Sequence, residues 1–250
     1  FLKMILPKIF HKTFELFGFE LKKINHNNPF IVDVRKIKIH KDNYELYQYT
    51  KSNGEFDYEK YKSIQTARNK SKINKFRADE HVMEFLSKYI KNNINDFNFG
   101  LCHGTRTGKE QEWFRKYLNC DVIGTEISDT ATQFPNTIQW DFHKSKPEWI
   151  NAVDFIYTNS LDHTYSPEKA LNTWMSCVKK EGFLIIEHSA GHTKSTETDP
   201  FGAHVSQMPY LILLWSKGKF FVSEILDMPE EHRNKDKNTK FLIVKNSIEI

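Results

Sequence analysis

Cysteine is scarce in this chain: its 250 residues include three, Cys102, Cys120 and Cys177, and no two of them form a CxxC pair. An odd count without paired spacing supports neither a disulfide framework nor a zinc ribbon. Because unpaired cysteines persist in reducing compartments, we expect a cytoplasmic protein.

Long hydrophobic runs are absent as well. The longest, Tyr210–Trp215, has six residues, whereas a membrane-spanning helix needs about 18–20. Two lysines and a proline interrupt the apolar character of residues 1–10, and no small-residue cleavage site follows. We therefore expect neither a transmembrane segment nor a signal peptide.

An excess of one charge is also missing. The chain has 36 basic and 32 acidic residues, a net charge of +4, and 30 of the basic residues are lysines spread among acids. This composition argues against a dedicated nucleic-acid-binding protein. Hydrophobic and charged fractions of 39% and 27% are typical of a folded protein, and the length allows one large domain or one domain with an appendage.

Residues 1–25 alternate large apolar side chains with lysine. Phe10, Phe14, Phe17 and Leu21 recur at close to the spacing of one helix face. This pattern predicts an amphipathic helix, which either packs on its own protein or docks on a membrane surface or another protein.

The next segment is expected to be mixed. Turn signals within residues 26–56 surround Ile31–Val34 and Tyr44–Tyr49, which predicts short strands. From Tyr58 to Ile90 the pattern becomes helical. We assign residues 1–75 to an N-terminal helical appendage and residues 76–250 to the main domain.

Short apolar runs alternate with helical patterns in the main domain. Helices are predicted at Lys109–Leu118 and at Pro167–Lys179, where Ser166 is the N-cap and proline occupies the first helical position. This alternation predicts a Rossmann-like, doubly wound α/β fold with a mostly parallel, seven-stranded sheet. No helical period separates the last two runs, so we expect them to close the sheet as an antiparallel pair, with the last strand antiparallel. The predicted strands are Phe97–Cys102, Asp121–Ile127, Thr137–Trp140, Val153–Thr158, Gly182–Glu187, Phe220–Leu226 and Lys240–Lys245.

Glycine is also infrequent, with ten residues, yet Gly104 and Gly108 follow the first strand of this domain and precede a helix. Such a turn lets the backbone approach a ligand because glycine has no Cβ. The spacing is neither GxGxxG nor the phosphate-binding GxxxxGK[ST] loop. The residues alone fit a ligand-binding loop and a plain tight turn equally well.

Polar side chains follow the next strands, at the sheet edge where ligands of such folds bind. Glu126 lies 18 residues after Gly108, a position from which an acid accepts hydrogen bonds from a ribose diol. Asp141 either accepts from an adenine amino group beside Trp140 or Phe142, or caps a helix beside a buried aromatic pair. The loop Asn159–His163 gathers hydrogen-bonding groups after the fourth strand.

In this order, the segment from Phe97 to His188 resembles the class I S-adenosylmethionine-dependent methyltransferases. The loop Asn159–His163, followed by Ser166 and Pro167, resembles the corresponding loop of small-molecule and glycan methyltransferases. The resemblance implies S-adenosylmethionine as the cofactor. The residues that it assigns to cofactor binding are His103, Gly104, Thr105, Arg106, Gly108, Glu126, Ile127, Asp141, Phe142, Asn159 and Ser160.

Within that set, the resemblance implies that Gly104 and Gly108 border the methionine part and that Glu126 holds the ribose. Asp141 and Phe142 would contact the adenine, and Asn159 and Ser160 would lie near the methionine amino group. The sequence departs from the family at the acid that usually precedes the first glycine, where it has Cys102 and His103. Arg106 replaces a further glycine and would bind the methionine carboxylate as a charge-assisted fork.

Upstream, the polar segment Tyr61–Lys72 precedes the first strand of the domain. It is either a solvated basic helix or a lid that contacts the cofactor or an acidic substrate. Related enzymes often place a lid helix at this position.

Histidines follow several predicted strands. Methyl transfer to a hydroxyl or amine requires removal of a proton, and a neutral histidine suits that step. His163 and His188 are the candidate bases. The histidines include one HxxxH pair, His188 and His192, and no HxH pair, and we expect no metal site.

The predicted activity is methyl transfer to an O or N of a small molecule or glycan, without a nucleic-acid partner. A nicotinamide-dependent enzyme would require three glycines around a pyrophosphate, and this loop has too few. The alternative is a non-catalytic binding or scaffold protein on a degenerate methyltransferase fold.

Overall fold

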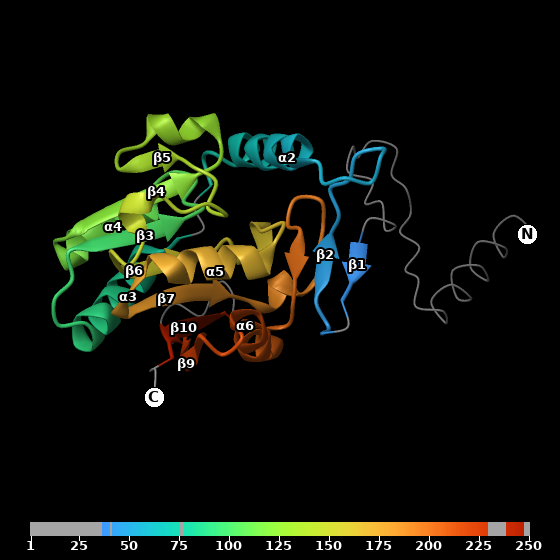
Figure 1. The fold of residues 1–250 in the computed structure, drawn as a ribbon. Coiled ribbons are helices and arrows are strands. Elements are labelled where there is room, and N and C mark those ends of the chain that lie inside the picture. Colours follow the sequence, from blue (N-terminus) through green and yellow to red (C-terminus); the bar gives the residue numbers. More distant parts are fainter. Residues whose placement is uncertain (1–36, 41, 76–77, 230–238, 248–250) are drawn as a thin grey trace, which may run out of the picture. The chain divides into compact units, whose positions relative to one another are not determined.

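The computed structural model describes residues 37–40, 42–75, 78–229 and 239–247 (Figure 1). They belong to one compact unit that starts after Asp33. The amphipathic helix expected in residues 1–25, with its docking role, and the strand expected at Ile31–Val34 lie outside the described residues.

A mixed seven-stranded sheet forms the centre of this unit, with the order β5-β4-β3-β6-β7-β10-β9. Strands β3 to β7 pair in parallel, and β10 is antiparallel to both β7 and β9. The predicted α/β fold with a mostly parallel sheet and an antiparallel last strand is therefore confirmed. The strands are β3 (Phe99–His103), β4 (Asp121–Glu126), β5 (Thr137–Gln139), β6 (Val153–Thr158), β7 (Val178–His188), β9 (Phe220–Asp227) and β10 (Lys240–Asn246).

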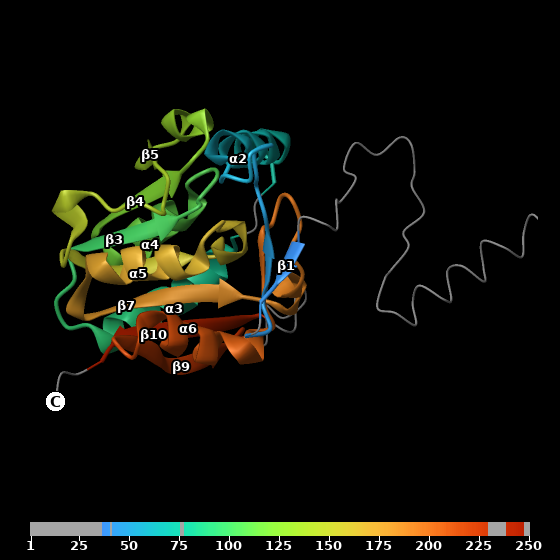
Figure 2. The ribbon, with the colours of Figure 1, turned by 45° about the vertical axis from the view of Figure 1, so that its right-hand side comes forward.

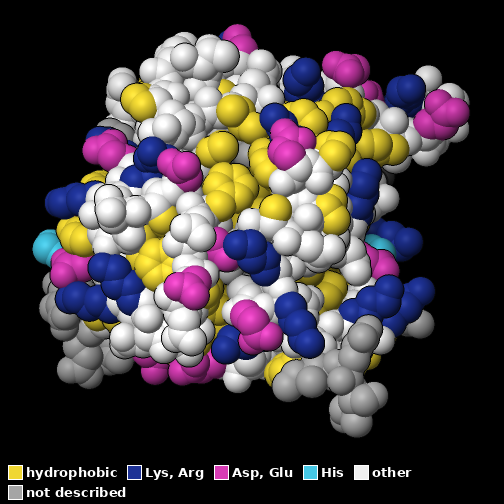
Figure 3. Space-filling view, turned by 60° about the vertical axis from the view of Figure 1, so that its left-hand side comes forward, with side chains coloured by type: hydrophobic (Ala, Val, Ile, Leu, Met, Phe, Trp, Pro, Cys, Tyr) yellow, Lys and Arg dark blue, Asp and Glu magenta, His cyan; other side chains and the backbone are white. Residues whose placement is uncertain are grey.

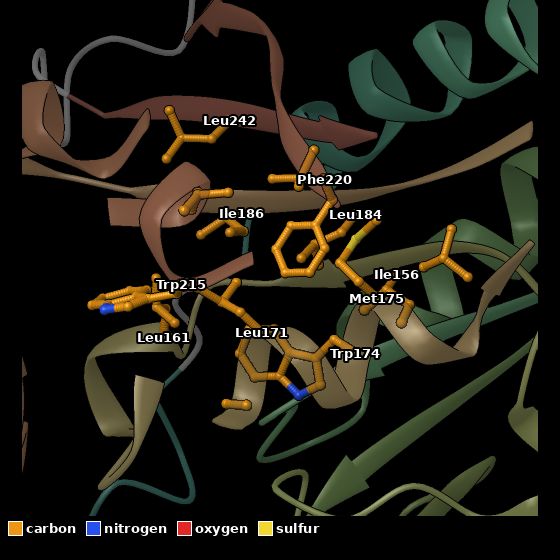
Figure 4. Packing of buried hydrophobic residues seen from close by; sticks show 14 of the residues in the cluster. Ile156, Leu161, Leu171, Trp174, Met175, Leu184, Ile186, Trp215, Phe220 and Leu242 are labelled. Carbon is orange, nitrogen blue, oxygen red and sulfur yellow. The ribbon is translucent and has the colours of Figure 1, made fainter. Parts of the chain in front are cut away.

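Helices cover both faces of this sheet. Successive side chains of a strand point to opposite faces, and in β7 Leu184 and Ile186 belong to a core cluster with α5 and α6 (Figure 4). The alternate residues Phe183 and Ile185 belong to a second cluster with α3 and α4. Burial on both faces explains why central strands such as β6 appear in the sequence as continuous apolar runs. The helices are α3 (Glu80–Asn93), α4 (Lys109–Leu118), α5 (Pro167–Cys177) and α6 (Met208–Ser216).

Helices α5 and α6 differ from the prediction. Helix α5 ends at Cys177 rather than at Lys179, because Val178 already pairs with Val153 as the first residue of β7. The sequence did not predict α6, whose residues Met208–Ser216 are apolar nearly all around and so have no 3.6-residue period.

A smaller three-stranded sheet, with the order β1-β2-β8, lies beyond the carboxyl ends of the parallel strands (Figure 2). It consists of β1 (Ile37–Ile39), β2 (Glu45–Tyr47) and β8 (Phe201–Gly202), and helix α2 (Tyr58–Ser71) follows β2 in the chain. The buried tyrosines Tyr47, Tyr49 and Tyr61 form one cluster that anchors α2. The expected strand at Tyr44–Tyr49 is present as β2, and the domain boundary between residues 75 and 76 stays a prediction.

Short 3-10 helices connect these elements. They are η2 (Asp129–Gln133), η3 (Pro147–Trp149), η4 (Leu161–His163), η5 (Ala190–Thr193) and η6 (Val205–Gln207). Because η4 and η5 follow β6 and β7 directly, they bring the polar residues after these strands back over the sheet edge.

The exterior has no gathering of one charge on the face drawn in Figure 3, where basic and acidic side chains are interspersed. Within the described part of the chain, no helix has the length and apolar character needed to cross a bilayer.

Candidate active site

A cavity of about 420 Å³ lies at the carboxyl ends of β3, β4 and β6, and residues of α2 form one of its walls. This is the edge of a parallel sheet at which ligands bind. Nine of the residues predicted from the sequence line it: Gly104, Thr105, Arg106, Glu126, Ile127, Phe142, Asn159, Ser160 and His163.

The other four predicted residues, His103, Gly108, Asp141 and His188, are not among its lining residues. His103 is buried against Trp174, with its Nδ1 2.8 Å from Thr125 Oγ1, and burial lowers the pKa of this histidine to about 3. His103 therefore stays neutral, and its packing supports the adjoining turn at Gly104. Gly108 has a φ of +74° and caps the start of α4.

Asp141 is engaged within the protein. Its Oδ1 accepts hydrogen bonds from the backbone N–H of His143 at 2.9 Å and lies 2.8 Å from His143 Nδ1. Its Oδ2 accepts from the hydroxyl of Tyr58 at 3.0 Å. These bonds tie the end of β5 to α2, while the neighbouring Phe142 faces the cavity.

The turn after β3 fits tightly against the loop after β6. Gly104 has a φ of +75°, and a Cβ at this position would lie 2.5 Å from the Cβ of Ser160. The Ser160 hydroxyl donates to the carbonyl oxygen of Gly104 at 3.3 Å. A residue without a side chain is thus required here for two reasons, the positive φ and the close approach.

Glu126 lies at the end of β4 with its carboxylate held by the backbone. Its two oxygens accept from the N–H groups of Ser128 at 2.9 Å and Arg106 at 3.2 Å. Burial raises the pKa of Glu126, and these hydrogen bonds oppose the shift. A carboxylate accepts about four hydrogen bonds in all, so this fixed group can also receive a ligand diol.

Glu110 is a buried carboxyl group that the sequence reasoning missed. It lines the cavity from the first turn of α4, and burial raises its pKa to about 7 while a hydrogen bond from the Asn159 side chain opposes that shift. An acid in a first helical turn is commonly explained by the helix dipole alone. The sequence did contain one indication that Glu110 lies in the site, because helix α4 starts at the glycine turn and its first turn therefore faces the ligand site.

His163, in η4, has acceptors around its Nδ1 atom. Gln65 Oε1 lies at 3.0 Å, the Thr198 carbonyl oxygen at 3.1 Å and Asp199 Oδ1 at 3.8 Å. The Gln65 amide also donates to the Thr198 carbonyl oxygen at 3.0 Å, which fixes its orientation. Because only oxygens face Nδ1, the proton belongs on Nδ1, and Nε2 carries the lone pair.

Asp162, His163 and Asp199 present side-chain atoms within 4.8 Å of one another, close enough to bind a metal ion. However, Asp162 Oδ2 lies 3.7 Å from His192 Nε2, and Asp199 Oδ2 accepts from the Thr198 hydroxyl at 3.2 Å. Both carboxylates of this cluster are thus also engaged with neighbouring side chains.

Helix α2 contributes more to the cavity than its polar sequence indicated. The side chains that face the cavity from α2 and its C-cap are Tyr61, Gln65, Arg68, Asn69 and Lys72. Residues of α2 thus line the cavity, and the role of this helix as a lid over a cofactor or an acidic substrate stays a prediction. Further lining residues that the sequence reasoning missed lie after β7: Ser189, Gly191, His192, Lys194, Thr196 and Asp199.

No protein-family model matches the sequence, and no curated protein matches it either. Among solved structures, the chain is similar to the 1,6-didemethyltoxoflavin-N1-methyltransferase of Burkholderia thailandensis, with bound 1,6-didemethyltoxoflavin and S-adenosylhomocysteine. That likeness has 11% identity and a TM-score of 0.58, and it covers 86% of this chain and 100% of the other. The plantazolicin methyltransferase BpumL in complex with SAH is also similar, at 16% identity and a TM-score of 0.54, over 75% and 95% of the two chains. As the sequence resemblance predicted, the chain has the fold of the class I S-adenosylmethionine-dependent methyltransferases.

Proposed function

We propose that the chain is an S-adenosylmethionine-dependent methyltransferase that acts on an O or N of a small molecule or glycan. The observation that carries this proposal is the meeting of Glu126, the Gly104 turn and His163 in one cavity at the carboxyl edge of the sheet. Two similar structures, with 1,6-didemethyltoxoflavin and plantazolicin in their names, support a small-molecule acceptor.

The residues present fit the cofactor. Glu126 would accept from the ribose hydroxyls, and Phe142 and Ile127 offer apolar contacts to the adenine. Asp141 already accepts from Tyr58 and His143, so a direct contact of its carboxylate with adenine would require one of these bonds to open.

At the other end of the site, opposite charges suit an amino acid. Glu110 and Asn159 would bind the ammonium group of the methionine moiety, and Arg106 its carboxylate. The Gly104 turn leaves room that a Cβ would fill.

The proposed chemistry needs one donor and one base. When bound, S-adenosylmethionine supplies an electrophilic methyl group. His163 would then take the proton of the acceptor hydroxyl or amine on Nε2, while Gln65 and Thr198 hold the proton on Nδ1. His188 is less suited, because its Nε2 lies 2.9 Å from the Ala203 carbonyl oxygen and burial lowers its pKa to about 4.

We also propose a cytoplasmic location. All three cysteines are free thiols, with Cys102 and Cys177 buried, which suits a reducing compartment.

The proposal is tested by calorimetric titration with S-adenosylhomocysteine. Glu126→Ala should weaken binding by about 1–3 kcal/mol, the scale for losing hydrogen bonds to a charged acceptor. Glu84→Ala is the matched control, because this half-exposed acid on α3 forms an ion pair with Lys88 and does not line the cavity. An unchanged dissociation constant in Glu126→Ala would remove the ribose assignment, and no binding by the wild type would remove the proposed function.

A further inference from the structure

Two half-buried cations, one in helix α2 and one at its C-cap, face the cavity and have no ion-pair partner among the described residues. Arg68 lies in α2 and Lys72 is its C-cap residue, and both line the cavity. Among the described residues, neither Arg68 nor Lys72 has a carboxylate oxygen within ion-pair distance of its side chain. By contrast, Lys60 lies 3.4 Å from Glu197 and Lys70 lies 2.8 Å from Asp129.

The residues around Arg68 and Lys72 balance the two positive charges only in part. The Nε of Arg68 is buried without a hydrogen-bond partner among the described residues. Burial and the charge of Arg68 lower the pKa of Lys72, and Asp199 opposes this only in part. Among the cavity carboxylates, Glu126 accepts from two backbone N–H groups and Asp199 from threonine hydroxyls, and neither forms an ion pair with Arg68 or Lys72 in the described part of the chain. An anion entering the cavity would therefore be stabilised at Arg68 and Lys72.

The helix geometry relates these cations to the reacting end of the site. Gln65 contacts His163 directly, and Arg68 follows Gln65 by three residues, on the same face of α2 and about 4.5 Å further along the axis. A molecule whose hydroxyl or amine lies at His163 thus has Arg68 within reach of its next few atoms. Arg106, at the glycine turn, remains for the single carboxylate of the cofactor.

Resting on the proposed function, we propose that Arg68 and Lys72 bind an anionic group of the methyl acceptor, a carboxylate or a phosphate ester. The arginine fork matches two oxygens of either group, and the lysine adds a point charge. The acceptor is accordingly an acidic small molecule or an acidic sugar rather than a neutral one.

The test uses the full chain saturated with S-adenosylhomocysteine and titrated by calorimetry with inorganic phosphate, and separately with succinate. We expect the wild-type complex to bind at least one of these probes in a 1:1 ratio. Arg68→Gln and Lys72→Gln should each weaken that binding at least about tenfold, as expected for the loss of a charged hydrogen bond. Lys70→Gln is the control on the same helix, because Lys70 pairs outward with Asp129, and it should bind the probe like the wild type.

The affinity for S-adenosylhomocysteine separates the possible outcomes. It should stay unchanged in both variants. A complex that binds neither probe would overturn the anion site alone. Loss of S-adenosylhomocysteine binding in Arg68→Gln or Lys72→Gln, or competition between it and phosphate, would overturn it too, because the cations would then hold the cofactor. A wild-type chain that does not bind S-adenosylhomocysteine would overturn the proposed function together with this inference.

Discussion

Replacing His163 with alanine should lower turnover about 10²–10⁴-fold, the range for loss of a general base. The affinity for S-adenosylhomocysteine should change little, since the proposed ribose and methionine contacts come from other residues. The measurement is release of S-adenosylhomocysteine with a panel of hydroxyl- and amine-bearing acceptors, including acidic ones.

His188→Ala is the comparison that locates the base. His188 does not line the cavity, so its loss should cost turnover far less than the loss of His163. If His188→Ala shows the large decrease and His163→Ala does not, the base follows β7 instead of β6. Equal rates in all three proteins would mean that the enzyme works by positioning alone.

Gly104→Ala should abolish measurable binding of S-adenosylhomocysteine. The new Cβ would lie 2.5 Å from the Cβ of Ser160, in a residue with a φ of +75°. The turn and the loop after β6 must then separate, which displaces two walls of the cavity. Calorimetric titration measures the loss, and circular dichroism checks that the sheet and helices remain.

Two further variants separate the steric effect from the backbone effect. Gly218 has a similar positive φ, +81°, but nothing within 4 Å of an added Cβ, so Gly218→Ala should bind S-adenosylhomocysteine like the wild type. The double variant Gly104→Ala with Ser160→Gly removes the clash and should recover part of the affinity. Wild-type affinity in Gly104→Ala alone would show that the turn has no part in binding.

The fold was predictable where burial leaves a direct trace in the sequence. The strands β3 to β7 lie between two helical layers, so runs such as Val153–Thr158 stand out as continuous apolar segments. Strand β8 has two residues, Phe201–Gly202, and depends on pairing with β2, which no local pattern encodes. Helix α6 was missed because its apolar residues surround the helix axis and obscure the period.

The site was predictable to the extent that topology decides it. Glu126 and Asn159 follow parallel strands, and the carboxyl ends of such strands meet at one edge. The contact that orients His163, the proposed base, could not be predicted, because Gln65 is 98 positions away from it in sequence. Asp199 lies in the long segment after β7, where spacing alone gives no information about which strand end it approaches. Glu110 resembled an ordinary helix-stabilising acid.

The hydrogen bonds between Gln65, His163 and Thr198 have a consequence for the timing of a catalytic cycle. They join helix α2, the loop after β6 and the segment before β8 at one imidazole. An outward movement of α2 that admits or releases a ligand would remove the Gln65 partner from the imidazole and leave the Thr198 carbonyl oxygen. In the proposed methyltransferase, ligand exchange and proton removal would then belong to separate moments, because both Nδ1 partners hold the imidazole only while α2 lies against it.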